Sequence, residues 1–116
     1  RNVIAVLPGE DPALREECVV YTAHWDGFGI NPAATGDRIL NGAADNAVAV
    51  AMLLDIARGM SDLPSGERPK RSVVFLSPTA EEKGLLGSRF YVAHPLFPLR
   101  RTVANLNLEP LDANQA

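Results

Sequence analysis

Six residues in four short segments of the sequence are of types that can bind a metal ion or transfer a proton. The set consists of His24, Asp26, Asp45, Glu81, Glu82 and Glu109. One imidazole together with several carboxylates suits zinc, with Mn²⁺ or Co²⁺ as further candidates. A carboxylate beside such an ion can also serve as a general base toward water. These residue types therefore point to a metal site with acid–base chemistry, provided that the fold brings the four segments together.

Charge supports the same interpretation. Five carboxylates gathered at a partly buried site would repel one another, and some of them would have to bind protons. A divalent cation removes this repulsion. The chain has a formal net charge of −3, and without these five carboxylates nine acidic residues would stand against eleven Lys and Arg. The acidic excess is therefore concentrated at the candidate site.

The spacing within two of the segments suggests separate roles for neighbouring side chains. In the extended segment His24-Trp25-Asp26, residues two apart point to the same side. Asp26 can then accept the second ring N–H of His24 and hold its tautomer. The adjacent carboxylates Glu81 and Glu82 point in different directions, so that one can bind a metal while the other acts as general base.

Each segment also has an explanation without a metal. The histidine and its neighbouring aspartate could be an incidental pair. Asp45 and Asn46 could cap a following helix, and Glu81-Glu82 could be first-turn acids favoured by a helix dipole. Glu109 could be a solvated charge at a strand end. Their common placement favours a site, because every segment follows a predicted strand or begins the next helix.

The surrounding pattern predicts four strands and two helices in the order β-β-α-β-α-β. The predicted strands are 3–7, 18–23, 72–76 and 102–108, and the predicted helices are 43–58 and 85–93. Strands separated by helices indicate an α/β fold, with a mixed or largely parallel sheet between two helical layers. Ligands in such folds bind at the carboxyl ends of the strands, where the six residues are expected.

The remaining segments give local expectations. Apolar residues run almost all round the helix at 43–58, which predicts a buried helix, with Gly59 as its C-cap. Residues 27–42 have several glycines and no clear period, and are predicted to be loop. Residues 10–17 are expected to form a short helical turn, and the polar tail 109–116 is expected to fray.

Length and composition exclude several classes. A chain of 116 residues is one domain. Its single cysteine, Cys18, excludes an intrachain disulfide and a cysteine-rich zinc module. It has no apolar run of about 18 residues, so no membrane span is expected, and its mild acidity gives no footprint for nucleic acid. The start at Arg1, directly before a strand, suggests a segment of a longer protein, with a processed mature chain as the alternative.

Read together, four segments resemble the M28 family of co-catalytic zinc aminopeptidases. They are Tyr21-Thr22-Ala23-His24-Trp25-Asp26, Asn41-Gly42-Ala43-Ala44-Asp45-Asn46-Ala47, Thr79-Ala80-Glu81-Glu82-Lys83-Gly84-Leu85-Leu86-Gly87-Ser88 and Asn105-Leu106-Asn107-Leu108-Glu109. The segments occur in the family's order and cover nearly the whole chain. The resemblance implies the N-terminal half of a catalytic domain, and therefore a single partial domain over residues 1–116.

The resemblance also implies a role for each candidate residue. His24 would bind the first zinc ion, Asp26 would orient it, Asp45 would bridge two zinc ions, Glu81 would be the general base and Glu82 would bind the second ion. Glu109 matches the other ligand of the first zinc, although the family usually carries Asp there, within Asn-x-Asp. A cis peptide is expected between Asp45 and Asn46. The family's histidine for the second zinc lies beyond the fourth strand, and His94 is a poor substitute that we expect at the surface.

The implied function is a metal-dependent hydrolase core that binds one or two zinc ions and acts on a peptide or another small hydrolysable substrate. The shortened chain is expected to show weak or altered activity, on activated esters or phosphoesters. Its exposed sheet edge predicts a homo-oligomer. Two alternatives remain: a non-catalytic interaction module, and acyl transfer at a single metal as in glutaminyl cyclases. Family members are often secreted or periplasmic, which a single cysteine allows.

Overall fold

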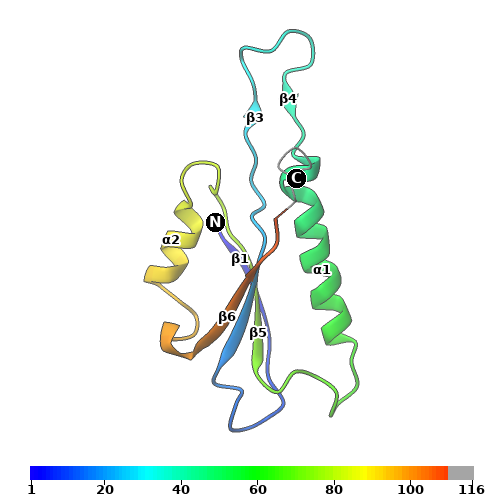
Figure 1. Ribbon diagram of the computed structural model, residues 1–116, viewed down its shortest axis with the longest axis vertical. Coiled ribbons are helices and arrows are strands. Elements are labelled where there is room, and N and C mark those ends of the chain that lie inside the picture. Colours follow the sequence, from blue (N-terminus) through cyan, green and yellow to red (C-terminus); the bar gives the residue numbers. More distant parts are fainter. Residues whose placement is uncertain (110–116) are drawn as a thin grey trace, which may run out of the picture.

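Apolar segments form one mixed sheet in the computed structural model, which describes residues 1–109 (Figure 1). The strands are β1 (Val3–Leu7), β2 (Cys18–Thr22), β5 (Ser72–Ser77) and β6 (Thr102–Asn107). They lie in the order β1-β5-β2-β6. β5, β2 and β6 run parallel, whereas β1 pairs antiparallel with β5 at one edge. The predicted strands and the mixed sheet are confirmed.

One helix covers each face of the sheet. The helices are α1 (Val48–Ser61) and α2 (Leu86–Ala93). Figure 1 shows them on opposite sides of the strands. Alternate residues of β5 point to opposite faces, so Phe75 packs with Leu53 of α1 whereas Leu76 packs with Tyr91 of α2. Every residue of β5 is buried as a result. The predicted three layers are confirmed.

The prediction that the first helix is buried all round is wrong. Within α1 only Ala49 and Leu53 are buried, whereas Met52 is 50% and Leu54 65% exposed. The helix forms an outer layer, so one stripe of it contacts the sheet and its other apolar side chains face outward. The expected C-cap is also wrong, because α1 continues through Gly59 to Ser61.

A separate π-helical turn, η1 (Ala43–Ala47), precedes α1, which begins later than predicted. Asp45 and Asn46 have backbone angles outside the helical region. Neither η1 nor α1 has a side-chain hydrogen bond at its N-cap, so the capping explanation for Asp45 and Asn46 finds no support. The peptide bond between these two residues is cis, as the resemblance implied.

The segment predicted to be loop contains a small hairpin instead. β3 (Gly29–Ile30) pairs antiparallel with β4 (Ile39–Leu40), and Figure 1 shows this hairpin projecting from the end of the sheet. Strands of two residues are too short to produce an alternating pattern, which explains why the sequence did not reveal them.

The shorter connections agree with expectation where the structure describes them. Residues 10–17 form a turn, closed by hydrogen bonds from the N–H groups of Leu14 and Arg15 to the carbonyl oxygen of Asp11. A 3₁₀ turn, η2 (Leu99–Arg101), leads into β6. The tail expected to fray is 109–116, and of this segment residues 110–116 lie outside the described residues. Among residues 1–109, no helix is long and apolar enough to cross a membrane.

Candidate metal centre

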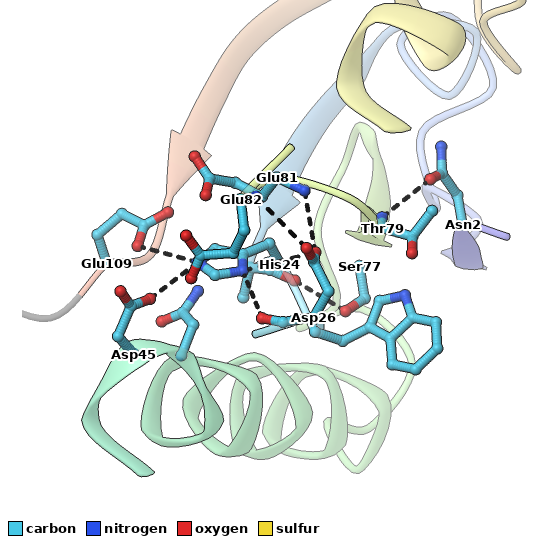
Figure 2. A network of polar contacts seen from close by, with 12 residues as sticks. Asn2, His24, Asp26, Asp45, Ser77, Thr79, Glu81, Glu82 and Glu109 are labelled. Carbon is cyan, nitrogen blue, oxygen red and sulfur yellow. Dashed lines mark hydrogen bonds and ion pairs between the residues drawn. The ribbon is translucent and has the colours of Figure 1, made fainter. Parts of the chain in front are cut away.

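His24 lies two residues beyond the end of β2 and forms the centre of a cluster of carboxylates (Figure 2). The residue is only 2% exposed. Its Nε2 atom lies 3.1 Å from Oδ1 of Asp45, and its Nδ1 atom lies 3.1 Å from the backbone oxygen of Asp26. With the proton on Nδ1 and donated to that carbonyl oxygen, Nε2 carries no hydrogen and directs its lone pair toward the carboxylates. A metal-binding histidine requires this tautomer.

The carboxylate of Asp26 makes different contacts from those expected. Its Oδ1 atom lies 3.7 Å from Nδ1 of His24, which is too long for a hydrogen bond. The two carboxylate oxygens instead accept hydrogen bonds from the backbone N–H groups of Glu81 (3.0 Å) and Glu82 (3.4 Å). Asp26 therefore connects the loop after β2 to the loop after β5, and its own carbonyl group orients the histidine.

His24, Asp45 and Glu82 each offer one ligand atom, and these three atoms lie within 4.8 Å of one another. Two ligands of a tetrahedral zinc ion lie about 3.3 Å apart, given bonds of about 2.0 Å. The distance of 3.1 Å between His24 and Asp45 is already close to this value. The chemistry and the spacing of the donors therefore fit a zinc ion.

Glu82 shows the clearest electrostatic signature of this cluster. Burial raises the pKa of its carboxyl group, and the charges of Asp45 and Glu81 raise the pKa further, whereas His24 lowers it. Its Oε1 atom is buried and has no hydrogen-bond partner among the described residues. A buried oxygen without a partner is costly, and a cation beside it would both satisfy the oxygen and relieve the repulsion.

Glu109 reaches the same histidine from the end of β6. Its Oε2 atom lies 3.7 Å from Nε2 of His24, and its Oε1 atom accepts a hydrogen bond of 3.0 Å from the side-chain amide of Asn107. Asn107 in turn accepts a 2.6 Å hydrogen bond from the hydroxyl of Thr22. The longer glutamate arm is thus held beside the cluster, although Glu109 is not one of the three most closely grouped residues.

Glu81 lines a cavity and is not one of the three most closely grouped residues. The cavity has a volume of about 400 Å³ and lies between α2 and β6, where Glu81, Glu109 and His24 line it. Much of the remaining lining is apolar, including Leu76 and Leu85. The two adjacent glutamates therefore have different surroundings, with Glu81 at a space that could receive a substrate.

His94 lies at the end of α2, away from the cluster in its contacts. It is exposed, its ring stacks on Phe90 with centroids 4.5 Å apart, and its Nδ1 atom lies 3.2 Å from the carbonyl oxygen of Phe90. Among the described residues, the cluster that could hold a metal consists of His24, Asp45 and Glu82 and does not include His94. The expectation of a helix-end surface residue agrees with these contacts.

Two asparagines beside the site were not singled out as functional from the sequence. Asn107 orients Glu109, as described above. Asn46 is 3% exposed, and its amide donates a 3.4 Å hydrogen bond to the carbonyl of Leu108. The signal for Asn107 was its place at the end of a strand, two residues before Glu109, because residues two apart in an extended segment point to the same side. The contact of Asn46 joins residues far apart in sequence and had no local signal.

The sequence of this chain is similar to those of known peptidases. The sequence model of Peptidase family M28 matches residues 2–116. The chain is 34% identical over 107 residues to a vacuolar membrane protease of Tuber melanosporum, a match that covers 90% of this chain and 10% of the relative. It is 32% identical over 111 residues to aminopeptidase YwaD of Bacillus subtilis, covering 94% and 21% of the two chains.

A solved structure agrees with these matches. The structure of BSAP, a zinc aminopeptidase from Bacillus subtilis, superposes with a TM-score of 0.70 at 31% identity, covering 94% of this chain and 24% of that one. The chain therefore spans a quarter or less of each of these three relatives. Because the family match extends over residues 2–116 and the fold agrees with a member's structure, the chain belongs to Peptidase family M28.

Proposed function

We propose that this chain carries the zinc-binding core of a metal-dependent peptidase. The proposed ligands are His24, Asp45, Glu82 and Glu109, with Asp26 as the residue that holds the site's loops together. One observation carries this proposal: Glu82 has a buried oxygen without a partner in the same cluster in which His24, Asp45 and Glu82 each place a ligand atom within 4.8 Å of the others. The four ligands supply one nitrogen and three carboxylates, which suits one or two zinc ions.

Glu81 is the proposed general base. Zinc, when bound, polarises a carbonyl group and makes water more acidic. The carboxylate of Glu81 lines the cavity beside the ligands, so it can take a proton from water there and pass it to the leaving amine. The bond from the Glu81 N–H to Asp26 fixes the start of this side chain. Positioning of this kind is required because a general base must lie within hydrogen-bond reach of the proton that it takes.

The proposed substrate of the protein is a peptide with a free N-terminus, because two of the similar proteins are named aminopeptidases. The 116-residue chain by itself is proposed to act weakly, and on activated esters as well as on amino-acid anilides. On one side the wall of its cavity is formed by β6, and no further strand of the described sheet lies beyond β6. An open site of this kind excludes water poorly, and the polar interactions inside it are correspondingly weaker.

The experiment that tests this proposal combines metal content with hydrolysis. The wild-type chain, Glu81→Gln and the surface control Glu67→Gln are loaded with zinc, and metal per chain is measured by elemental mass spectrometry. We expect all three proteins to bind zinc equally. Hydrolysis of amino-acid 4-nitroanilides and 4-nitrophenyl acetate should fall about 100-fold or more in Glu81→Gln alone.

Three results would contradict the proposal. A wild-type chain that folds but binds no zinc would remove the metal site and favour an interaction module. A zinc-loaded wild-type chain without hydrolysis would remove the catalytic role of this chain. Full activity in Glu81→Gln would remove the assignment of the general base and leave the metal site in place.

A further inference from the structure

We propose that Asn2 is a positioning residue for the metal site, acting through the loop that carries Glu81 and Glu82. This inference rests on the proposed zinc site, because Asn2 itself touches none of the proposed ligands. The loop extends from the end of β5 to the start of α2. It supplies both Glu81 and Glu82, so its conformation sets where these two carboxylates lie.

Asn2 closes the base of this loop with both ends of its amide. Its Oδ1 atom accepts a 3.1 Å hydrogen bond from the backbone N–H of Thr79 (Figure 2). Its Nδ2 atom donates a 2.8 Å hydrogen bond to the carbonyl of Gly87. Thr79 lies at the start of the loop, and Gly87 lies in the first turn of α2, directly after the loop. A residue just before the edge strand β1 therefore ties together two points of the chain that it meets only through tertiary structure.

The close approach of Asn2 depends on a glycine. A Cβ atom placed on Gly87 would collide with Oδ1 of Asn2 and with the backbone oxygen of Thr79. The N–H of Gly87 also donates a 2.9 Å hydrogen bond to the carbonyl of Thr79. The asparagine, the glycine and the threonine backbone thus form one packed contact at the base of the loop.

The loop needs such support because its backbone is strained. Ala80 has a φ angle of +54° and Leu85 one of +62°, both in the left-handed region that residues with a Cβ disfavour. Conformations of this kind persist only where surrounding contacts hold them in place. Asn2 provides such contacts at the base, and Asp26 provides them at the tip through the N–H groups of Glu81 and Glu82.

A side-chain amide meets the hydrogen-bonding requirement at this position. Thr79 offers a donor and Gly87 an acceptor, so the side chain must accept with one atom and donate with the other. Asn2→Asp keeps the size and the acceptor, but it loses the donor and places a negative oxygen against the carbonyl of Gly87. Asn2→Ala loses both bonds.

The test is a Co²⁺ titration of the 116-residue chain, followed by visible absorption, because the intensity and position of the cobalt bands report the ligand geometry. The variants are Asn2→Ala and Asn2→Asp, with Asn31→Ala as matched control. Asn31 also makes a side-chain hydrogen bond to backbone, with the N–H of Ala33 at 3.0 Å, but it lies in the β3–β4 hairpin. We expect Kd to rise about 10- to 100-fold in Asn2→Ala, with altered bands. Asn2→Asp should lie between Asn2→Ala and wild type, and Asn31→Ala should equal wild type.

Amide hydrogen exchange of the metal-free proteins gives a second, independent measurement. In both Asn2 variants the N–H groups of Glu81 and Glu82 should exchange faster, whereas that of Val20 in β2 should keep its protection. This pattern separates local release of the loop from global unfolding. If Asn2→Ala loses protection at Val20 as well, Asn2→Asp becomes the deciding variant.

The outcomes distinguish this inference from the proposed function. Wild-type affinity and bands in Asn2→Asp and Asn2→Ala would overturn the positioning role. A wild-type chain that binds no Co²⁺ would instead overturn the zinc site. In that case unchanged exchange at Glu81 and Glu82 in the variants would overturn the role of Asn2 too, and faster exchange there would support it as the anchor of the loop.

Discussion

At the scale of single residues, Glu82 combines two features that conflict in a chain without metal. Its pKa is raised first by burial and then by Asp45 and Glu81, and one of its oxygens has no partner among the described residues. The ionised form of this side chain is therefore disfavoured in the folded chain. A cation reverses the balance, because the same crowded carboxylates then become ligands. The crowding of these carboxylates should therefore both lower the stability of the metal-free chain and raise its affinity for a metal ion.

This conflict predicts opposite effects of Glu82→Gln on stability and on metal binding. In the metal-free chain the substitution removes a charge that the fold disfavours. The free energy of unfolding at neutral pH should rise, by no more than about 1 kcal/mol because solvent screens an open site. Zinc affinity should fall sharply, because an amide oxygen is a poorer ligand than a carboxylate. Urea denaturation with and without zinc measures both effects.

The matched control is Glu67→Gln on the surface, which should change neither quantity. A loss of stability in metal-free Glu82→Gln would show that the carboxylate has a partner in solution. Unchanged zinc affinity would remove Glu82 from the proposed ligand set.

At the scale of elements, α1 is an outer helix with apolar residues on both of its sides. Leu53 is 4% exposed and packs in the cluster with Phe75, whereas its neighbour Leu54 is 65% exposed. The composition of the helix does not distinguish these two leucines. Only the position of the sheet decides which of them stabilises the fold, since burial and not residue type determines the hydrophobic contribution.

The two leucines therefore predict a large difference between similar substitutions. Leu53→Ala should lower the free energy of unfolding by about 2–5 kcal/mol, because it leaves a cavity under α1. Leu54→Ala should change it by less than about 0.5 kcal/mol. Urea midpoints of the two variants measure the difference, and equal losses would mean that something covers the outer face of α1 in solution.

At the largest scale, the sheet formed by residues 1–109 has two open edges, β1 and β6. Val103 is 55% and Leu106 41% exposed on β6. Open edge strands carry unpaired backbone groups and associate readily. We therefore keep the proposal that the isolated chain forms homo-oligomers through its sheet edge. Association there would also cover the open side of the cavity that Glu81 lines.

This proposal predicts that a charge on β6 shifts the chain toward monomer. Val103→Lys should lower the sedimentation coefficient at a given concentration, because a lysine at an edge opposes strand pairing. Leu54→Lys is the matched control, since it places the same charge on an exposed apolar site outside the sheet. A wild-type chain that sediments as a monomer at all concentrations would remove the proposal, and an equal effect of both lysines would place the contact elsewhere.

The amino-acid pattern predicted the elements whose signal is local. The strand at residues 3–7 has the predicted bounds, and each of the other three strands differs by one residue at its C-terminal end, because apolar runs between turn residues are recognised without tertiary contacts. The chain order of these elements then predicted that residues after parallel strands meet at one edge. His24, Asp45 and Glu82 do lie together.

Features that depend on contacts between distant segments could not be predicted from the sequence and are seen in the folded chain alone. The burial of α1 depends on which of its sides faces the sheet, and the β3–β4 hairpin depends on pairing between strands too short to show a pattern. Asp26 binds the loop after β5 rather than the ring of His24, and Asn2 meets Gly87 across 85 residues of sequence. The sequence shows which hydrogen-bonding groups are present, but their partners depend on the fold. Each buried polar group forms hydrogen bonds with the groups that tertiary packing places next to it.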